Sequence, residues 1–430
     1  MVAVLHFAVL IVFTGYAFMT LVSKPSYVKL SKKEKVLLTG REKFLLLTLV
    51  TGMVQAGSFS ALRLMLWMAM IVLAFMLYRK PPRFNRLNMV YIVFLFWLGI
   101  TMLWSPDLSY AMRAYLKYLY PLLALFFAAV FVQSKDFIFV AMRWMLIVSF
   151  VLSVFLGGFA IHSVGFIFYL YGMFWPPSTL ADYLAVMSAA SFVMWWRTGE
   201  KKYLLLIGWF LLSDVTTGIR TGILSIGIML MAGSYLRYKL LSLPYLAAAL
   251  VIGVAAILFV PQVKNKMFFD PAKVQSVGDI AGAVSGNNVN TNMRGYMWAH
   301  LLAQFYVGHE GTGSGLGSVQ QYMYENYVFG GLQVPHSDYV QMLCDSGNAA
   351  VLLYLLFPIM LYFYTLKYVH KKPTTPIGAS AVLAVLAYAA VLPAMGFDNV
   401  VNYSFASHSY PFMFAGIFLA YKRMERKANV

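Results

Sequence analysis

Cysteine and charge are both scarce in this 430-residue chain. The single cysteine, Cys344, excludes an intrachain disulfide and any metal site built from several cysteines. Charged residues make up only 11% of the sequence, whereas a soluble domain carries about 25%. This is too little charge to cover a water-facing surface, so a soluble protein is excluded. Together with 61% hydrophobic residues, the composition predicts a polytopic integral membrane protein.

Acidic residues are the scarcer of the charged types, with 15 Asp and Glu against 33 Lys and Arg, which gives a net charge of +18. In a soluble protein such an excess would suggest nucleic-acid binding. In a membrane protein it is typical of cytoplasmic loops that follow the positive-inside rule. We therefore expect membrane lipid, and no nucleic acid, among the partners.

Apolar runs near the length of a membrane-spanning helix occur along most of the chain. The run at 44–56 is short enough to be half a span, so 12 and 13 spans are both open, and so is the side of the N-terminus. The first run lacks the positive start and cleavage site of a secretory signal, and we expect it to be a membrane helix. The runs are 3–22, 44–56, 59–78, 87–104, 111–133, 136–158, 178–196, 203–216, 219–236, 243–260, 345–366, 377–395 and 406–421.

The loops between these runs alternate between basic and nearly uncharged. The basic loops hold 24 of the 33 Lys and Arg residues and include the C-terminal cluster 422–427, which places them and the C-terminus in the cytoplasm. The opposite side carries one long neutral segment, rich in Gly, Asn, Ser and Gln. We expect three parts: a transmembrane bundle at 1–260, an external loop domain with short helices at 261–337, and transmembrane helices with a short tail at 338–430.

The external segment contains two recognisable patterns. Apolar residues at helical spacing predict an amphipathic helix over 294–305, with Arg294 in its first turn and polar residues at 290–292 as its cap. Arg294 there either binds lipid phosphates or serves a site. The glycine-rich stretch at 309–317 lacks the strand and helix of a nucleotide-binding fingerprint, so we expect a structural turn.

His336 and Arg220 are the residues best suited to chemistry. His336 precedes a helix that begins near Ser337 or Asp338, and histidine suits proton transfer near neutral pH, although a lone histidine is more often structural. Arg220 interrupts apolar sequence near membrane depth, which suggests function, or else an ion pair with Asp214. No spacing typical of metal ligands surrounds His336. Other cations near the predicted external helix ends, which with Arg220 would suit a polyanionic head group, are Arg63, Arg113 and Lys117.

The order of these motifs resembles a known family. An arginine in Thr217-Gly-Ile-Arg-Thr-Gly222 is followed by a long external loop that contains Arg-x-x-x-Trp (Arg294 to Trp298), Gly-x-Gly-x-Gly (Gly313 to Gly317) and Pro-His-Ser-x-Tyr (Pro335 to Tyr339). An acid-x-Gly follows at Asp345 and Gly347. This pattern, over residues 210–365, resembles the superfamily of O-antigen ligases, O-antigen polymerases and protein O-oligosaccharyltransferases.

The resemblance implies an all-α glycosyltransferase of the GT-C type with about 12 (12–13) transmembrane helices. It would transfer glycan from undecaprenyl diphosphate at the periplasmic face of the bacterial inner membrane, with no cofactor and no metal. By position, His336 matches the catalytic histidine, and Arg220 and Arg294 match the diphosphate-binding arginines. Asp345 departs from the family, which usually has glutamate there, so no role is assigned to it.

Within the superfamily, the short C-terminal tail and the neutral external loop favour an O-antigen ligase. Such an enzyme moves O-antigen from its lipid diphosphate to lipid A-core during lipopolysaccharide biosynthesis. An O-antigen polymerase is the alternative within the family. A lipid-linked glycan transporter is the alternative from another class, although the polar residues gather on one side only.

Overall fold

The protein is almost entirely helical in the computed structural model, which describes residues 2–31, 34–82, 84–156, 174–175, 177–217, 219–244, 247, 251, 258–259, 261–285, 288–290, 293–327, 329 and 332–428. The first elements are α1 (Val2–Val22), β1 (Ser26–Lys29), β2 (Lys35–Leu38), α2 (Gly40–Val50), α3 (Ser60–Leu77), α4 (Arg86–Thr101), α5 (Leu108–Phe131), α6 (Phe137–Leu156), α8 (Pro177–Thr198), α9 (Lys202–Thr217) and α10 (Arg220–Tyr238). The later helices are α12 (Pro261–Met267), α13 (Val277–Ser285), α14 (Arg294–Phe305), α15 (Ser318–Asn326), α16 (Asp338–Val369), α17 (Pro376–Phe397) and α18 (Ser409–Ala428). Short helical turns are η1 (Gly57–Phe59), η2 (Met102–Trp104), η3 (Lys239–Ser242), η4 (Pro271–Lys273), η5 (Val400–Tyr403) and η6 (Ser404–His408).

Seven of the described helices are long and apolar enough to cross a membrane, namely α1, α3, α4, α5, α6, α16 and α17. The chain is therefore an all-α polytopic membrane protein, as its composition predicts. α8, α9, α10 and α18 coincide with further apolar runs of the sequence. α2, with 11 residues, overlaps only the first part of the short run at 44–56. The run at 243–260 lies mostly outside the described residues, so the total of about 12 spans stays a prediction.

The helices before and after the 261–337 segment pack into one core. A continuous cluster of buried side chains extends from Ala17 to Tyr421. α18 contacts α5 and α17. Gly416 lies against α5, since a Cβ there would lie 2.4 Å from the carbonyl oxygen of Leu125. The C-terminal helices thus complete the bundle that the N-terminal helices begin.

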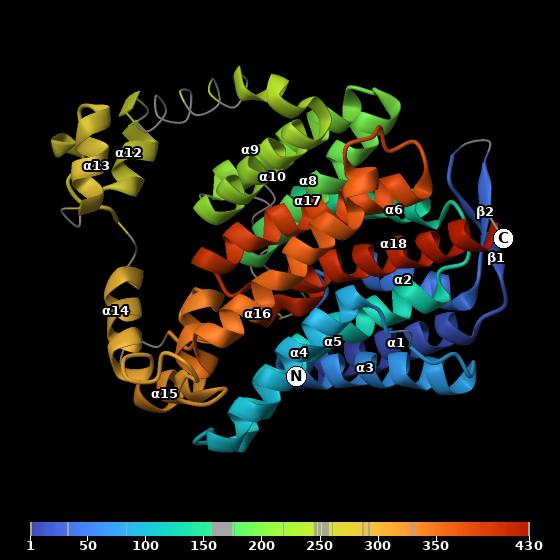
Figure 1. The fold of residues 1–430 in the computed structure, drawn as a ribbon, viewed down its shortest axis with the longest axis horizontal. Helices are drawn as coiled ribbons and strands as arrows, with labels where there is room; N and C mark the ends of the chain where they lie inside the picture. The colour runs from blue at the N-terminus through green and yellow to red at the C-terminus, as the bar shows by residue number, and fades with distance from the viewer. Residues whose placement is uncertain are drawn as a thin grey trace.

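The segment predicted to be external and the basic segments at the hairpin and the C-terminus lie at opposite ends of this bundle. The short helices α12, α13, α14 and α15 occupy the left of Figure 1, whereas the β1–β2 hairpin and the C-terminus lie at the right. The predicted loop domain is therefore separated from the basic tail by the length of the bundle. Which end faces the cytoplasm stays a prediction.

The basic loop between α1 and α2 contains a hairpin that the sequence reading missed. β1 and β2 pair antiparallel, with Ser26 opposite Leu38. Behind the hairpin, the buried carboxylate of Glu42 accepts hydrogen bonds from the backbone N–H groups of Gln133 and Ser134, at 2.9 and 2.6 Å. Glu42 thereby ties the start of α2 to the start of α6.

The glycine-rich segment at 309–317 is a structural turn, as expected. Gly313 and Gly315 have φ angles of 68° and 105°, which residues with a Cβ rarely adopt. A Cβ on Gly313 would lie 2.3 Å from the amide nitrogen of Ser346. The N–H of Gly315 donates to the carbonyl of Asp345 at 3.0 Å. The N–H of Ser314 donates to the carbonyl of Cys344 in α16, and that of Gly313 donates to the carbonyl of His309 within the turn. These N–H groups are therefore already used and do not form a phosphate cradle.

The turn fits against a kink in α16. Gly347 has φ 73° and ψ −175° inside the helix, and a Cβ there would lie 2.5 Å from the carbonyl of Gly311. The buried Asp345 carboxylate accepts a hydrogen bond from the N–H of Val319 at 3.0 Å. Asp345 therefore fixes the start of α15 to α16, and so helps to place the segment that leads to His336.

Candidate active site

His336 lies immediately before α16. Ser337 caps this helix, because its Oγ accepts a hydrogen bond from the N–H of Val340 at 3.3 Å; the predicted helix start is thus confirmed. His336 has φ 52°, and such a conformation costs a non-glycine residue about 1–3 kcal/mol and is common at functional sites. Its side chain is 24% exposed, so the ring lies at the edge of the buried core.

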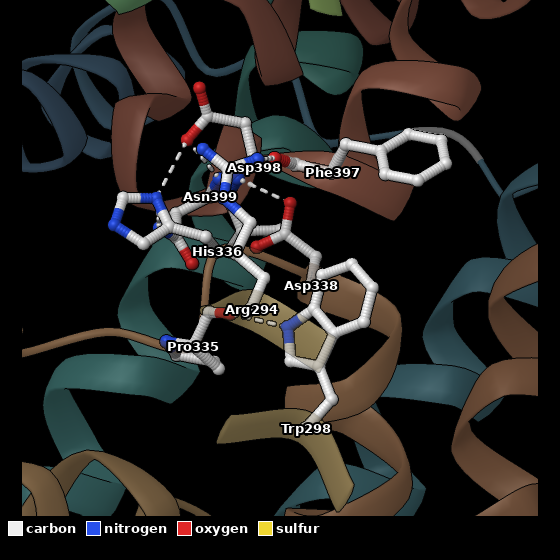
Figure 2. Close-up of polar contacts among 9 residues, drawn as sticks. Arg294, Trp298, Pro335, His336, Asp338, Phe397, Asp398 and Asn399 are labelled. Atoms are coloured by element: carbon white, nitrogen blue, oxygen red, sulfur yellow. Dashed lines mark hydrogen bonds and ion pairs between the residues drawn. The ribbon is translucent and has the colours of Figure 1, made fainter. Parts of the chain in front are cut away.

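The imidazole of His336 faces the chain that follows α17. Its Nδ1 lies 3.4 Å from Oδ1 of Asp398 and 3.2 Å from Nδ2 of Asn399 (Figure 2). A carboxylate can only accept, so the contact with Asp398 requires a proton on Nδ1, whereas the NH2 group of Asn399 can only donate and requires a lone pair there. The two contacts therefore belong to different tautomers, and the one selected by Asp398 has the proton on Nδ1. Nε2, which points away from Asp398 in Figure 2, then has a lone pair available. This geometry suits a general base.

The residues after His336 hold α16 against the end of α17. The buried Asp338 carboxylate accepts a hydrogen bond from the N–H of Val401 at 3.1 Å. The hydroxyl of Tyr339 donates to the carbonyl of Leu392 at 2.9 Å. These contacts fix the 398–401 segment, and with it the groups that face the imidazole.

α14 supplies the arginine of the site and fixes the residue before the histidine. Arg294 and Trp298 lie on one face of α14 because they are four residues apart. The indole Nε1 of Trp298 donates to the carbonyl of Pro335 at 2.7 Å, and Nη1 of Arg294 donates to the carbonyl of Phe397 (Figure 2). The Arg-x-x-x-Trp motif thus joins the ends of α16 and α17.

The predicted amphipathic helix at 294–305 is confirmed as α14. Its buried Met297 and Leu301 pack against α15 and α16. The residue before the helix is Met293, at φ 66°, and the expected cap from 290–292 stays a prediction. Thr291 and Asn292 lie outside the described residues.

Arg220 is the first residue of α10 and reaches the same region. Its Nη1 donates to the carbonyl of Asn290 at 3.1 Å, close to the start of α14. Burial lowers the pKa of Arg294 below its ordinary value; attraction by Asp398 opposes this shift, and repulsion from Arg220 adds to it. The structure therefore places Arg294 near Asp398, which also contacts His336, and places Arg220 near Arg294. The ion pair of Arg220 with Asp214 stays an alternative.

Two of the three further cations lie on α5. Lys117 donates to the side-chain oxygen of Asn402, and its charge interacts with that of Asp338, so it lies beside the segment that faces His336. Arg113 is exposed, with its guanidinium 5.5 Å from the ring centre of Tyr110. Of this pair, Lys117 is the one that the fold brings to the site.

Arg63 has different surroundings from the other cations. Its side chain is 2% exposed, and its guanidinium donates to the carbonyls of Val54 and Thr51. The ring of Phe405 lies 4.4 Å from it. Within the described part of the chain these contacts serve helix packing, and none of them joins Arg63 to His336.

Sequence reasoning missed Asp398 and Asn399, which lie nearest to the catalytic candidate. Their signal was present in Gly396-Phe-Asp-Asn-Val400, where a carboxylate and an amide interrupt apolar sequence between two long runs. Buried ionisable groups between membrane helices are costly and usually serve a function. Their pairing with His336 depends on contacts across 62 and 63 positions, which periodicity does not predict.

Among the residues that the structure describes, no group of three or more His, Cys, Asp and Glu side chains is arranged to hold a metal ion. No protein-family model and no curated protein matches this chain. The chemistry of the site is therefore argued from its own geometry, and a metal-independent reaction stays a prediction.

Proposed function

We propose that the protein is a membrane glycosyltransferase that takes glycan from a polyprenyl diphosphate, and that it acts as an O-antigen ligase with lipid A-core as acceptor. The observation that carries the proposal is that the imidazole of His336 and the guanidinium of Arg294 both lie near the buried Asp398, while Arg220 lies near Arg294 and bonds to Asn290 just before α14. All of them lie at the end of the bundle that carries α14 and α15.

The reaction assigns a role to each of these groups. The acceptor hydroxyl attacks the anomeric carbon and gives its proton to Nε2 of His336, while the bond from that carbon to the diphosphate oxygen breaks. The polyprenyl diphosphate leaves as an anion and needs no strong acid. Arg220 and Arg294 stabilise the charge that builds on it, because guanidinium groups match phosphate oxygens. Direct displacement inverts the anomeric configuration.

Asp398 acts in this scheme as a positioning residue. By accepting from Nδ1 it selects the tautomer in which Nε2 can take a proton, and it favours the imidazolium that forms. It also attracts the Arg294 guanidinium. One buried carboxylate thus orients the base and the anion-binding arginine towards the same reacting centre.

A reconstitution with separate acceptors tests the proposal. The purified full chain is given an undecaprenyl-diphosphate-linked glycan with lipid A-core, with a second lipid-linked glycan, or with a pilin-like protein. We expect a new glycosidic product with lipid A-core only. Product with the second lipid-linked glycan would assign a polymerase, and product with the protein an oligosaccharyltransferase.

The same preparation separates an enzyme from a carrier. In proteoliposomes with donor in one leaflet, the proposal predicts transfer to acceptor and no movement of donor between leaflets in the acceptor's absence. Donor that crosses the membrane while every acceptor stays unchanged would overturn the proposal in favour of a transporter.

A further inference from the structure

A groove lies at the hairpin end of the bundle, away from His336. It is lined by residues of the β1–β2 loop and of α6, α8 and α9, and its volume is about 640 Å³. Ligand sites for small molecules occupy about 300–1,000 Å³. The groove is therefore large enough for a polar head group and the first part of an attached chain.

Cations line the rim of this groove. Arg143 on α6 donates to the carbonyl of Leu30 in the hairpin, which fixes its guanidinium at the groove. Arg197, in the last turn of α8, lies with its guanidinium 3.7 Å from the ring centre of Phe139. Both arginines line the groove together with Tyr203 at the start of α9.

The carboxylates near this rim leave the two arginines with positive charge. Glu200 and Glu34 also line the groove; Glu200 forms an ion pair with Lys202, and the Glu34 side chain is exposed. Across the described residues, neither Arg143 nor Arg197 forms an ion pair. Both guanidinium groups therefore have hydrogen-bond donors available to an anion.

The wall below the rim is apolar and belongs to a candidate membrane span. Ile147, Phe150 and Val151 of α6 line the groove and are 43%, 45% and 45% exposed. They stand at helical spacing, one to two turns from Arg143. The groove thus presents cations at one end and an apolar wall that continues along a membrane-spanning helix.

We propose that this groove binds an anionic glycerophospholipid, with its phosphodiester on Arg143 and Arg197 and an acyl chain along α6. Guanidinium groups pair with phosphate oxygens in a fixed geometry, and basic pockets between membrane helices bind anionic head groups. A zwitterionic lipid of the same chain length fits the apolar wall equally well but offers no net negative charge. The site is separate from the proposed glycosyl transfer and does not depend on it.

Binding of dioleoyl phosphatidylglycerol to the purified full chain, measured by native mass spectrometry, tests the site. Replacing both arginines in Arg143→Gln/Arg197→Gln is expected to weaken binding by about tenfold to thirtyfold, since each cation contributes about 1 kcal/mol. The matched control is Arg79→Gln/Arg426→Gln, which removes two exposed arginines that do not line the groove. Equal weakening in both pairs would overturn the proposal.

Two further arms decide between a lipid and another occupant. Ile147→Trp fills the apolar part and keeps both arginines, so it should weaken phosphatidylglycerol binding while Leu205→Trp, on the exposed side of α9, does not. Dioleoyl phosphatidylcholine should bind no better to the native chain than to the double arginine variant. Displacement of the lipid by millimolar inorganic phosphate, or equal binding of both lipids, would contradict the assignment.

Discussion

His336 is held in its left-handed backbone conformation by the residues on both sides of it. The carbonyl of Pro335 accepts from Trp298, and Ser337 caps α16. The hydrogen bonds of Pro335 and Ser337 therefore hold His336 in this strained conformation, and they set the direction of its imidazole. In the proposed mechanism this strain would serve pre-organisation, because the ring would need no rearrangement before the acceptor hydroxyl approaches.

Removal of the imidazole should abolish most of the turnover. General-base catalysis contributes about 10²–10⁴-fold, so we expect His336→Ala to lower turnover by that factor while donor binding is kept. The control is His309→Ala, which removes an exposed histidine from the same external segment and should leave turnover unchanged. Transfer kinetics and the anomeric configuration of the product are the measurements; unchanged turnover in His336→Ala, or retention of configuration, would contradict the mechanism.

The two arginines should tolerate lysine poorly. Lysine keeps the charge but loses the fork that binds two phosphate oxygens. We expect Arg220→Lys and Arg294→Lys each to lose at least about tenfold in transfer rate, because one charge-assisted hydrogen bond contributes about 1.5–3 kcal/mol. Arg426→Lys, at an exposed arginine near the C-terminus, should behave as the native chain. Near-native rates in both site variants would refute the bidentate role.

At the level of elements, α14 is the helix that contacts both the segment before α16 and the end of α17. Its apolar face packs on α15 and α16, while Arg294 and Trp298 reach the carbonyls of Phe397 and Pro335. The helix itself was predictable from apolar spacing. Its contacts were not, because spacing gives the face of a helix and not the partner that meets it.

Loss of the indole donor alone should misplace His336 without unfolding α14. A hydrogen bond of this kind contributes about 0.5–1.5 kcal/mol, so Trp298→Phe is expected to lower turnover by about three- to tenfold with little change in donor binding. Trp104→Phe is the matched control, since Trp104 donates to the carbonyl of Gly313 at 3.3 Å, outside the site. An equal loss of turnover in both variants would show a general effect on packing.

The difference between a helix face, which residue spacing predicts, and its packing partner, which spacing does not predict, also explains which site residues could be predicted. His336, Arg220 and Arg294 could be found from residue type and motif order, because cations and a histidine in apolar or external sequence are unusual. Asp398 and Asn399 escaped notice although they interrupt an apolar stretch. Their contact with His336 depends on α17 ending beside the start of α16. The sequence of neither helix predicts this arrangement. The β1–β2 hairpin was missed for a similar reason, since its strands are four residues each.

At the scale of the whole molecule, the hairpin and the C-terminus lie at one end and α12 to α15 at the other. If the basic loops are cytoplasmic, the site faces the periplasm. Single cysteines at positions 285 and 428, in a Cys344→Ala background, should be labelled by an impermeant thiol reagent in intact spheroplasts at 285 only. The native Cys344 is fully buried, so its removal serves only to lower background. Labelling at 428 would reverse the orientation.

The interlocking of the last helices with the first has a consequence for biosynthesis. A nascent chain that has emerged as far as Val369 already contains His336, Arg220 and Arg294, but not Asp398, Asn399 or the Phe397 carbonyl that binds Arg294. Nor can α5 make its contacts with α18 before α18 is made. The candidate site groups thus acquire these partners only after α17 and the segment that follows it are made, and a chain that stops earlier holds the histidine and both arginines without the contacts that align His336 and Arg294.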